Sequence, residues 1–172
     1  QTNTAMCERL YGIAIEEAGL TGGEVVWDLY SGIGSIGLAL ARDAGRVVGI
    51  EIVPEAVEQA TANAQRNGIA NAEFIAGDVA KAVSPLVEAG APMPDVVVID
   101  PPRAGLTPKA VKRVIELGAR RVVYVSCNPT TLAGNAVLLT EGGYRLESVR
   151  PVDMFPHTPH VECVARFERV DQ

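Results

Sequence analysis

Two side chains that could do covalent chemistry stand at the ends of apolar segments in the second half of the chain. Cys127 directly follows the apolar run at residues 122–125, within the sequence Ser-Cys-Asn-Pro, and a thiolate there could act as a nucleophile. Glu162 lies in a turn that enters the last apolar segment, and its carboxylate could accept a proton. Each also has a purely structural alternative, because a cysteine is often a small buried hydrophobe and a glutamate often lies on the solvent face of a strand.

A glycine-rich turn in the first half predicts a nucleotide-type site. Residues 28–37 contain Gly-x-Gly-x-x-Gly between an apolar segment and a helical one, so that Gly32 permits a tight turn and Gly34 lets a ligand approach the backbone. Glu51 ends the next apolar segment and could accept hydrogen bonds from ribose hydroxyls, while Asp78 follows the third segment and could reach an adenine amino group. The alternative for both carboxylates is capping of a helix N-terminus.

The acidic residue before this turn favours one class of cofactor. Dinucleotide sites place a pyrophosphate on the helix N-terminus, and the carboxylate of Asp28 would repel it. A cationic ligand such as S-adenosylmethionine suits this position better, and an acidic residue followed by a loop of small residues is typical of methyltransferases that use it. The main rival, an NAD-dependent dehydrogenase, would lack an evident acid or base for hydride transfer. We therefore expect S-adenosylmethionine as the cofactor.

The motif Asp-Pro-Pro-Arg ends the fourth apolar segment and belongs with the same crevice. In open α/β sheets ligands bind at the carboxyl ends of the strands, so Asp100 and Cys127 should face the ligand held at Gly32. Beside a methyl donor a thiolate has a specific use. Its addition to carbon 6 of a pyrimidine makes carbon 5 nucleophilic, and a base must then remove the carbon-5 proton.

Two rival methyltransferase chemistries fit this segment less well. Enzymes that methylate amino groups usually follow Asp-Pro-Pro with an aromatic residue, where this chain has Arg103. RNA cytosine-C5 methyltransferases usually carry a second cysteine in the segment equivalent to residues 100–105, which holds none here. One cysteine and one candidate carboxylate therefore favour uracil over cytosine.

A metal site at the C-terminal turn is not expected. His157, His160 and Cys163 lie close in sequence, but they alternate poorly along a strand and no fourth ligand is evident. We expect the two histidines to shape the turn that presents Glu162, and Cys7 and Cys163 to be packing residues.

The order of the elements predicts how these residues are positioned. Short apolar segments alternate with helical patterns, which is typical of an α/β fold with a parallel sheet, and the last two segments predict an antiparallel edge. Strands are expected at residues 25–29, 47–51, 73–76, 96–99 and 122–125, helices at 36–43, 54–67, 79–88, 108–117 and 131–139, and the antiparallel pair at 144–149 and 161–167.

Length and charge set further bounds. The 172 residues are expected to form one domain, and the net charge of −6 taken alone argues against a nucleic-acid binder. The charge is unevenly divided, however, since residues 1–100 hold 5 basic and 14 acidic residues and residues 101–172 hold 10 basic and 7 acidic ones. No apolar run is long enough for a membrane helix, no secretory signal is evident, and three cysteines favour a reducing compartment.

The sequence closely resembles the catalytic domain of RNA uracil-5-methyltransferases, which make 5-methyluridine in ribosomal or transfer RNA. The resemblance covers essentially the whole chain and implies the Rossmann-like fold of class I S-adenosylmethionine-dependent methyltransferases, with a mostly parallel seven-stranded sheet and helices on both faces. The matching segments are residues 1–3, 28–34, 100–105, 125–129 and 153–162.

The resemblance also implies a role for each candidate residue. It makes Cys127 the nucleophile and Glu162 the base that removes the carbon-5 proton. The cofactor contacts it implies are Gln1, Tyr30, Glu51, Asp78 and Asp100, to which the glycine-rich turn adds Gly32 and Gly34. It implies that Asp100 also contacts the target uracil, and we expect Arg103 and Asn128 to contact it as well. The chain departs from the family at Ser31, often a cysteine, and at Ser35, an asparagine in some members.

Members of this family usually carry an N-terminal RNA-binding β-barrel and a central domain, sometimes with an iron–sulfur cluster. The present chain begins at the family's Gln-x-Asn element. We therefore expect residues 1–172 to be the catalytic domain alone, with most of the affinity for RNA elsewhere. We further expect an RNA partner, ribosomal rather than transfer RNA, a monomer, no membrane association and a cytoplasmic location. The alternative class is a module that only binds the cofactor, against which the intact pair of Cys127 and Glu162 argues.

Overall fold

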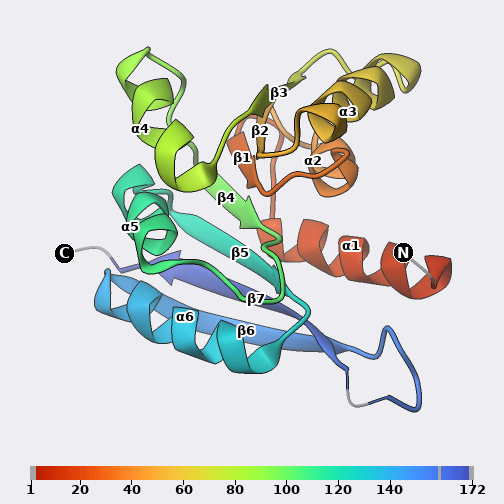
Figure 1. Ribbon diagram of the computed structural model, residues 1–172, viewed down its shortest axis with the longest axis vertical. Helices are drawn as coiled ribbons and strands as arrows, with labels where there is room; N and C mark the ends of the chain where they lie inside the picture. The colour runs from red at the N-terminus through yellow and green to blue at the C-terminus, as the bar shows by residue number, and fades with distance from the viewer. Residues whose placement is uncertain (1–2, 159, 171–172) are drawn as a thin grey trace.

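The computed structural model describes residues 3–158 and 160–170, and its centre is one twisted sheet (Figure 1). The strands are β1 (Val25–Leu29), β2 (Arg46–Glu51), β3 (Ala72–Ala76), β4 (Val96–Ile99), β5 (Arg121–Ser126), β6 (Tyr144–Val152) and β7 (Glu162–Arg169). Their order in the sheet is β3-β2-β1-β4-β5-β7-β6. Strands β1 to β5 run parallel, and β7 runs antiparallel to both β5 and β6.

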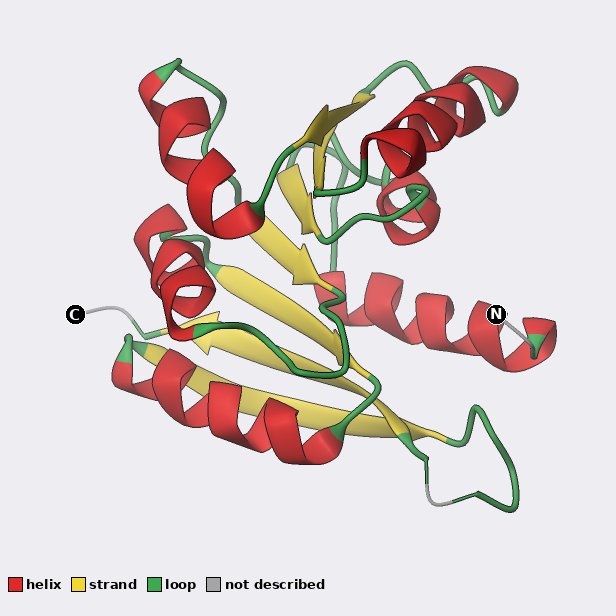
Figure 2. Cartoon of the chain, in the orientation of Figure 1, coloured by secondary structure: helices red, strands yellow, loops and turns green. Residues whose placement is uncertain are grey.

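Helices cover both faces of this sheet (Figure 2). They are α1 (Thr4–Ala18), α2 (Ser35–Leu40), α3 (Pro54–Arg66), α4 (Val79–Glu88), α5 (Pro108–Leu117) and α6 (Pro129–Glu141). The side chains of α1 and α2 join one hydrophobic cluster, and those of α4, α5 and α6 join another on the opposite face. The predicted α/β fold, with a mostly parallel seven-stranded sheet, an antiparallel edge and helices on both faces, is confirmed.

Burial of the strands follows their position in the sheet. All four residues of β4 are buried, as expected of a wholly apolar strand that is covered on both faces. Neighbouring residues of β1 divide between the faces, since Val26 joins the cluster under α1 and Trp27 joins the cluster under α4 to α6. The strand order changes direction at β1, whose neighbours are β2 and β4. A crevice at the carboxyl ends of these strands is where such folds bind ligands.

Several predicted boundaries were wrong by a few residues. The helix expected at 36–43 ends at Leu40 and continues as a turn, whereas the helix expected at 131–139 runs from Pro129 to Glu141. The antiparallel strands extend beyond 149 and 167, to Val152 and Arg169. Each extension follows from pairing between β6 and β7, which local sequence does not reveal.

Helix α1 was not predicted at all. Asn3 caps its N-terminus, since the side chain of Asn3 accepts a hydrogen bond from the backbone N–H of Met6 at 3.2 Å. Gly19, in the left-handed conformation, caps its C-terminus. Its buried face includes Glu17, which interrupts the apolar pattern of the helix. The carboxylate of Glu17 accepts a hydrogen bond from Ser148 Oγ at 2.9 Å. Only the tertiary structure supplies this partner.

Among the residues that the structure describes, no helix has both the length and the apolar character needed to cross a membrane.

Two glycines inside helices should respond oppositely to replacement by alanine. A Cβ on Gly37 of α2 would lie 2.6 Å from Asp28 Oδ2 and 3.3 Å from Val47 Cγ1, whereas a Cβ on the exposed Gly134 of α6 would meet nothing within 4 Å. We expect Gly134→Ala to raise the free energy of unfolding by about 0.5–1 kcal/mol because alanine is the better helix former. Gly37→Ala should lower it by about 1–3 kcal/mol because the helix must move away from β1.

Urea unfolding followed by circular dichroism measures both changes. A stabilising effect of Gly37→Ala would contradict the close approach of α2 to the Asp28 carboxylate, and Gly134→Ala serves as the matched control.

Candidate active site

A cavity of about 250 Å³ lies at the carboxyl ends of β1 and β4. It is lined by residues from the glycine-rich turn at 28–37 and from two other segments of the chain: Tyr11, Asp28, Tyr30, Ser31, Gly32, Ile33, Ser35, Ile36 and Asp100. The sequence analysis singled out Asp28, Tyr30, Gly32 and Asp100, and the structure brings all four together. Tyr11 was not predicted to lie here, because helix α1, which carries it, was not predicted.

The glycine-rich turn adopts a backbone that glycine favours. Gly32 and Gly34 have φ angles of 53° and 83°, and a Cβ on Gly34 would lie 2.8 Å from Phe74 Cζ. Tyr30 also has a positive φ, of 65°, which is uncommon for a residue with a side chain and marks local strain beside the cavity.

Glu51 holds this turn in place. One of its carboxylate oxygens accepts a hydrogen bond from Gly32 N at 2.9 Å, and the other accepts one from Val53 N at the same distance. The carboxylate thus links the turn to the segment that leads into α3. Each carboxylate oxygen can accept more than one hydrogen bond, so this structural role leaves the predicted ribose contacts possible.

Asp28 and Asp100 are carboxylates withdrawn from water. Asp28 is 1% exposed, and its Oδ2 accepts a hydrogen bond from Gly37 N at 2.9 Å. Burial, and then the neighbouring charge of Asp100, raises the pKa of Asp28 to about 7. Burial together with the charge of Glu162 raises the pKa of Asp100 to about 7. The cavity therefore favours a cationic ligand, which would stabilise both carboxylates in their charged form.

Asp78 does not cap the helix that it precedes. It occupies the N-cap position of α4, but its side chain accepts no hydrogen bond from that helix. Its Oδ1 is buried without a hydrogen-bond partner among the described residues, and the same holds for Asp28 Oδ1 and Ser31 Oγ. The capping alternative for Asp78 is therefore wrong.

These unpartnered polar atoms fit S-adenosylmethionine. The cofactor is a sulfonium cation with an amino group, ribose hydroxyls and an adenine amino group, and all of these groups are attracted to or donate to carboxylates. Fold and site together define a class I S-adenosylmethionine-dependent methyltransferase domain.

A second cavity, of about 290 Å³, contains both candidate catalytic residues. Strand β5 pairs with β7 up to the pair Ser126 and Cys163, and the next step in this register sets Cys127 opposite Glu162. The cavity is lined by Arg103, Cys127, Phe155, Thr158, His160 and Glu162. Sequence analysis did not single out Phe155 or Thr158, which no motif argument distinguished from the rest of the turn.

Charges in and near this cavity act on the Cys127 thiol. Burial raises its pKa, the carboxylates of Glu162 and Asp100 raise it further, and the guanidinium of Arg103 opposes them. Burial also raises the pKa of Glu162, again opposed by Arg103. Burial and the two carboxylates thus favour the protonated thiol, and a cation in the neighbouring cavity that Asp100 lines would weaken the contribution of Asp100.

Asn128 acts within the protein. Its Oδ1 accepts a hydrogen bond from Thr130 N at 3.1 Å, which caps α6, and its Nδ2 donates to Arg103 O at 3.3 Å. Thr131 Oγ1 also donates to Arg103 O at 3.3 Å. Asn128 therefore positions the loop that carries Arg103, and its predicted contact to a substrate stays a prediction.

A residue that sequence analysis missed anchors the same loop. Asn135 of α6 is buried, and its side chain accepts a hydrogen bond from Leu106 N at 2.8 Å and donates one to Leu106 O at 3.0 Å. Tyr124 OH donates to Asn135 Oδ1 at 2.8 Å. In the sequence, the signal for this role was that Asn135 is a polar residue at a position on the buried face of α6. Gln1, a predicted cofactor contact, lies outside the described residues.

The histidines of the C-terminal turn do not gather with other ligands. Within residues 3–158 and 160–170, no three His, Cys, Asp or Glu side chains are grouped so that they could hold a metal ion. His157 has a φ of 66°, and His160 contacts the guanidinium of Arg103.

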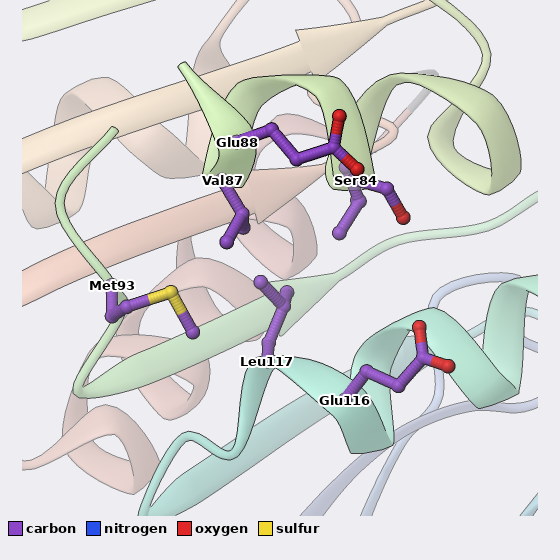
Figure 3. Close-up of a pocket in the computed structure, with 7 residues that line it drawn as sticks. Ser84, Val87, Glu88, Met93, Glu116 and Leu117 are labelled. Carbon is purple, nitrogen blue, oxygen red and sulfur yellow. The ribbon is translucent and has the colours of Figure 1, made fainter. Parts of the chain in front are cut away.

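A third cavity, of about 210 Å³, lies between the C-terminal turns of α4 and α5 (Figure 3). Apolar side chains form most of its wall, and two carboxylates lie beside them. Its lining residues are Val83, Ser84, Val87, Glu88, Met93, Glu116 and Leu117. It contains none of the residues that the sequence motifs single out.

Comparison with known proteins identifies the family. Residues 26–116 match the family model of the methyltransferase domain, and residues 90–170 match that of tRNA (uracil-5-)-methyltransferases. Uncharacterized RNA methyltransferases from Enterococcus faecalis and Clostridium acetobutylicum are 52% identical over 164 residues and 46% identical over 172 residues, which are 95% and 100% of this chain. The chain spans 36% and 37% of the length of these relatives.

A solved structure is also similar. The tRNA (uracil-54, C5)-methyltransferase of Pyrococcus abyssi, in complex with S-adenosyl-L-homocysteine, is 36% identical with a TM-score of 0.77, and the match covers 92% of this chain and 38% of that one. The chain belongs to the RNA uracil-5-methyltransferase family, whose methyltransferase domain depends on S-adenosylmethionine.

The buried carboxylate of Asp28 makes stability depend on pH. Its pKa is about 7 in the folded protein against an ordinary value of 3.8, so between these values the folded state holds a proton that the unfolded chain releases. The contribution of this group to the free energy of unfolding therefore falls as the pH rises from about 4 to about 7. Asp28→Asn keeps an acceptor for Gly37 N and removes the charge. We expect it to be more stable than the wild type at pH 8, by about 1–3 kcal/mol.

Urea unfolding between pH 5 and pH 8 measures this difference, which should shrink toward pH 5. The matched control is Asp43→Asn, at an exposed carboxylate outside the cavity, which should change stability little. A difference for Asp28→Asn that stays constant over this range would show that the folded state does not hold the proton.

Proposed function

We propose that the protein transfers a methyl group from S-adenosylmethionine to carbon 5 of a uridine in RNA. The observation that carries this proposal is the cavity that Cys127 and Glu162 both line, next to the acidic one. A thiol and a carboxylate are the two groups that methylation of uracil carbon 5 requires. Amino-group methylation would need neither.

Cys127 activates the base in the proposed mechanism. Its thiolate adds to carbon 6 of the uracil, and the electron pair of the carbon 5–carbon 6 bond moves toward carbon 4, which makes carbon 5 nucleophilic. When bound, S-adenosylmethionine supplies an electrophilic methyl group for that carbon. Glu162 then removes the proton from carbon 5, and the returning electron pair re-forms the double bond and expels Cys127 as a thiolate. Arg103 favours the thiolate and the carboxylate that these steps need.

The acidic cavity would hold the cofactor. Asp28 and Asp100 provide the negative charge that a sulfonium cation and an amino group require, and the remaining predicted contacts surround the same crevice. Those predicted contacts are Tyr30, Gly32, Gly34, Glu51 and Asp78. The contact predicted for Gln1 rests on the family resemblance alone.

RNA is the proposed substrate, since the relatives are named RNA methyltransferases. The Pyrococcus abyssi neighbour is named for a transfer RNA, while the sequence analysis favoured ribosomal RNA. Incubation of the protein with bulk ribosomal and transfer RNA, followed by mass spectrometry of the nucleosides, would identify both the RNA and the modified base. Formation of 5-methylcytidine or of a methylated amino group, without 5-methyluridine, would contradict the proposal. A monomer and a cytoplasmic location stay predictions.

Cys127→Ala should abolish methyl transfer while leaving cofactor affinity nearly unchanged. We expect a loss of about a thousandfold or more in rate, because carbon 5 is a poor nucleophile without the covalent bond to carbon 6. Transfer of radiolabelled methyl groups to RNA measures the rate, and calorimetric titration with S-adenosylhomocysteine measures the affinity. Cys163→Ala, at a buried cysteine of β7, is the matched control and should retain transfer. Turnover by Cys127→Ala at the wild-type rate would rule out the covalent mechanism.

Glu162→Gln should trap the covalent complex. The amide cannot take the carbon-5 proton, so the adduct between Cys127 and RNA should accumulate as a band of lower mobility on denaturing gels. The double variant Cys127→Ala, Glu162→Gln is the control and should give no such band. If Glu162→Gln turns over normally and no adduct forms, another group is the base.

A further inference from the structure

The cavity that Cys127 lines also contains a contact between the side chains of an arginine and a histidine. Arg103 Nη2 lies 3.3 Å from His160 Nδ1, and both residues line the cavity. A guanidinium can only donate and is always protonated. Nδ1 of His160 is therefore the acceptor, which makes the ring neutral and places its single proton on Nε2.

This tautomer leaves one donor without an assigned partner. Among the described residues, no acceptor for Nε2–H of His160 is found, and the side chain is exposed. The hydroxyl of Thr158, which lines the same cavity, already donates to Phe155 O at 2.7 Å. His160 therefore offers a neutral donor of fixed tautomer close to both Cys127 and Glu162.

We propose that His160 is a further catalytic residue, whose Nε2–H donates a hydrogen bond to oxygen 4 of the target uracil. The inference rests on the proposed function. When the Cys127 thiolate forms its bond to carbon 6, the electron pair of the carbon 5–carbon 6 bond becomes the carbon 4–carbon 5 bond, and negative charge develops on oxygen 4. A donor aimed at this atom stabilises the adduct more than the free base, which is the condition for catalysis.

The same contact separates uracil from cytosine. Cytosine carries an amino group at carbon 4, and two donors that face each other leave both unpaired. Arg103 is essential to this discrimination because its hydrogen bond to Nδ1 keeps the ring proton on Nε2, so that the imidazole does not present an unprotonated Nε2 as an acceptor to the base. Oxygen 2 of uracil gains no comparable charge on addition, so the contact should be specific to oxygen 4.

The test combines variants of His160 with single-atom changes in the substrate, using the full-length protein. His160→Asn retains an oxygen near the position of Nδ1 that can accept from Arg103, but it has no N–H near the position of Nε2. His160→Gln can place an N–H near the position of Nε2. The substrate is an RNA that the wild type methylates, with uridine, 4-thiouridine or 2-thiouridine at the target position. Sulfur accepts hydrogen bonds weakly, and its other effects on the reaction are shared by all enzyme variants.

We expect His160→Asn to lower the single-turnover rate on uridine about ten- to a hundredfold and His160→Gln to restore most of it. The ratio of rates on uridine and 4-thiouridine should be about tenfold larger for the wild type than for His160→Asn. With 2-thiouridine the two enzymes should show the same ratio. The amount of covalent adduct formed with Glu162→Gln should fall in parallel when His160→Asn is added. His157→Asn, the same replacement at the neighbouring histidine, should leave all of these values unchanged.

Equal ratios with 4-thiouridine in the wild type and His160→Asn would overturn the assignment of His160 alone. The same holds if His160→Gln is as slow as His160→Asn. Failure of the wild type to make 5-methyluridine on any RNA would instead overturn the proposed function, and this inference with it.

Discussion

Asp28 has a buried carboxylate in β1, close to the half-buried carboxylate of Asp100 that follows the adjacent parallel strand β4, and much of the surrounding structure depends on this constraint. A buried carboxylate is unfavourable unless hydrogen bonds or a positive charge compensate it. The backbone N–H of Gly37 gives Asp28 one hydrogen bond, and only a residue without a Cβ lets α2 come this close. The second oxygen of Asp28 has no partner among the described residues. A positive charge beside Asp28 and Asp100 would therefore stabilise these carboxylates, and S-adenosylmethionine carries such a charge on its sulfonium group.

The second constraint is the direction of β7. In a parallel sheet every strand ends at the edge where ligands bind, so a residue that begins a strand lies at the far edge. Strand β7 runs against its neighbours, and its first residue, Glu162, therefore lies at the same edge as Cys127, which follows β5. The antiparallel strand is what brings the proposed base, Glu162, to the carboxyl edge, where the parallel strands already place Asp100 and the proposed nucleophile, Cys127.

Those parts of the fold that depend on local signals could be predicted from the sequence. Strand β4, which is wholly apolar, and α5, which begins at Pro108, were both predicted with their observed bounds. Helix α1 could not be predicted in the same way, because its buried Glu17 is paired with Ser148, 131 residues away. The motifs also identified Asp28, Tyr30, Gly32 and Asp100 in the first cavity and Arg103, Cys127 and Glu162 in the second, but not Tyr11, Phe155 or Thr158. They did not reveal that Asn128 and Asn135 both hydrogen-bond to the loop that carries Arg103 and Leu106, since these contacts exist only after α6 packs beside this loop.

Asp100 acts on both cavities, because it lines the acidic one and its charge raises the pKa of the Cys127 thiol in the other. This sharing makes the two cavities thermodynamically linked. A cation beside Asp100 offsets the negative charge that holds the proton on Cys127, and by reciprocity a thiolate at Cys127 strengthens the attraction for that cation. The thiolate that the proposed covalent step needs is therefore favoured more when a cation lies beside Asp100 than when none does.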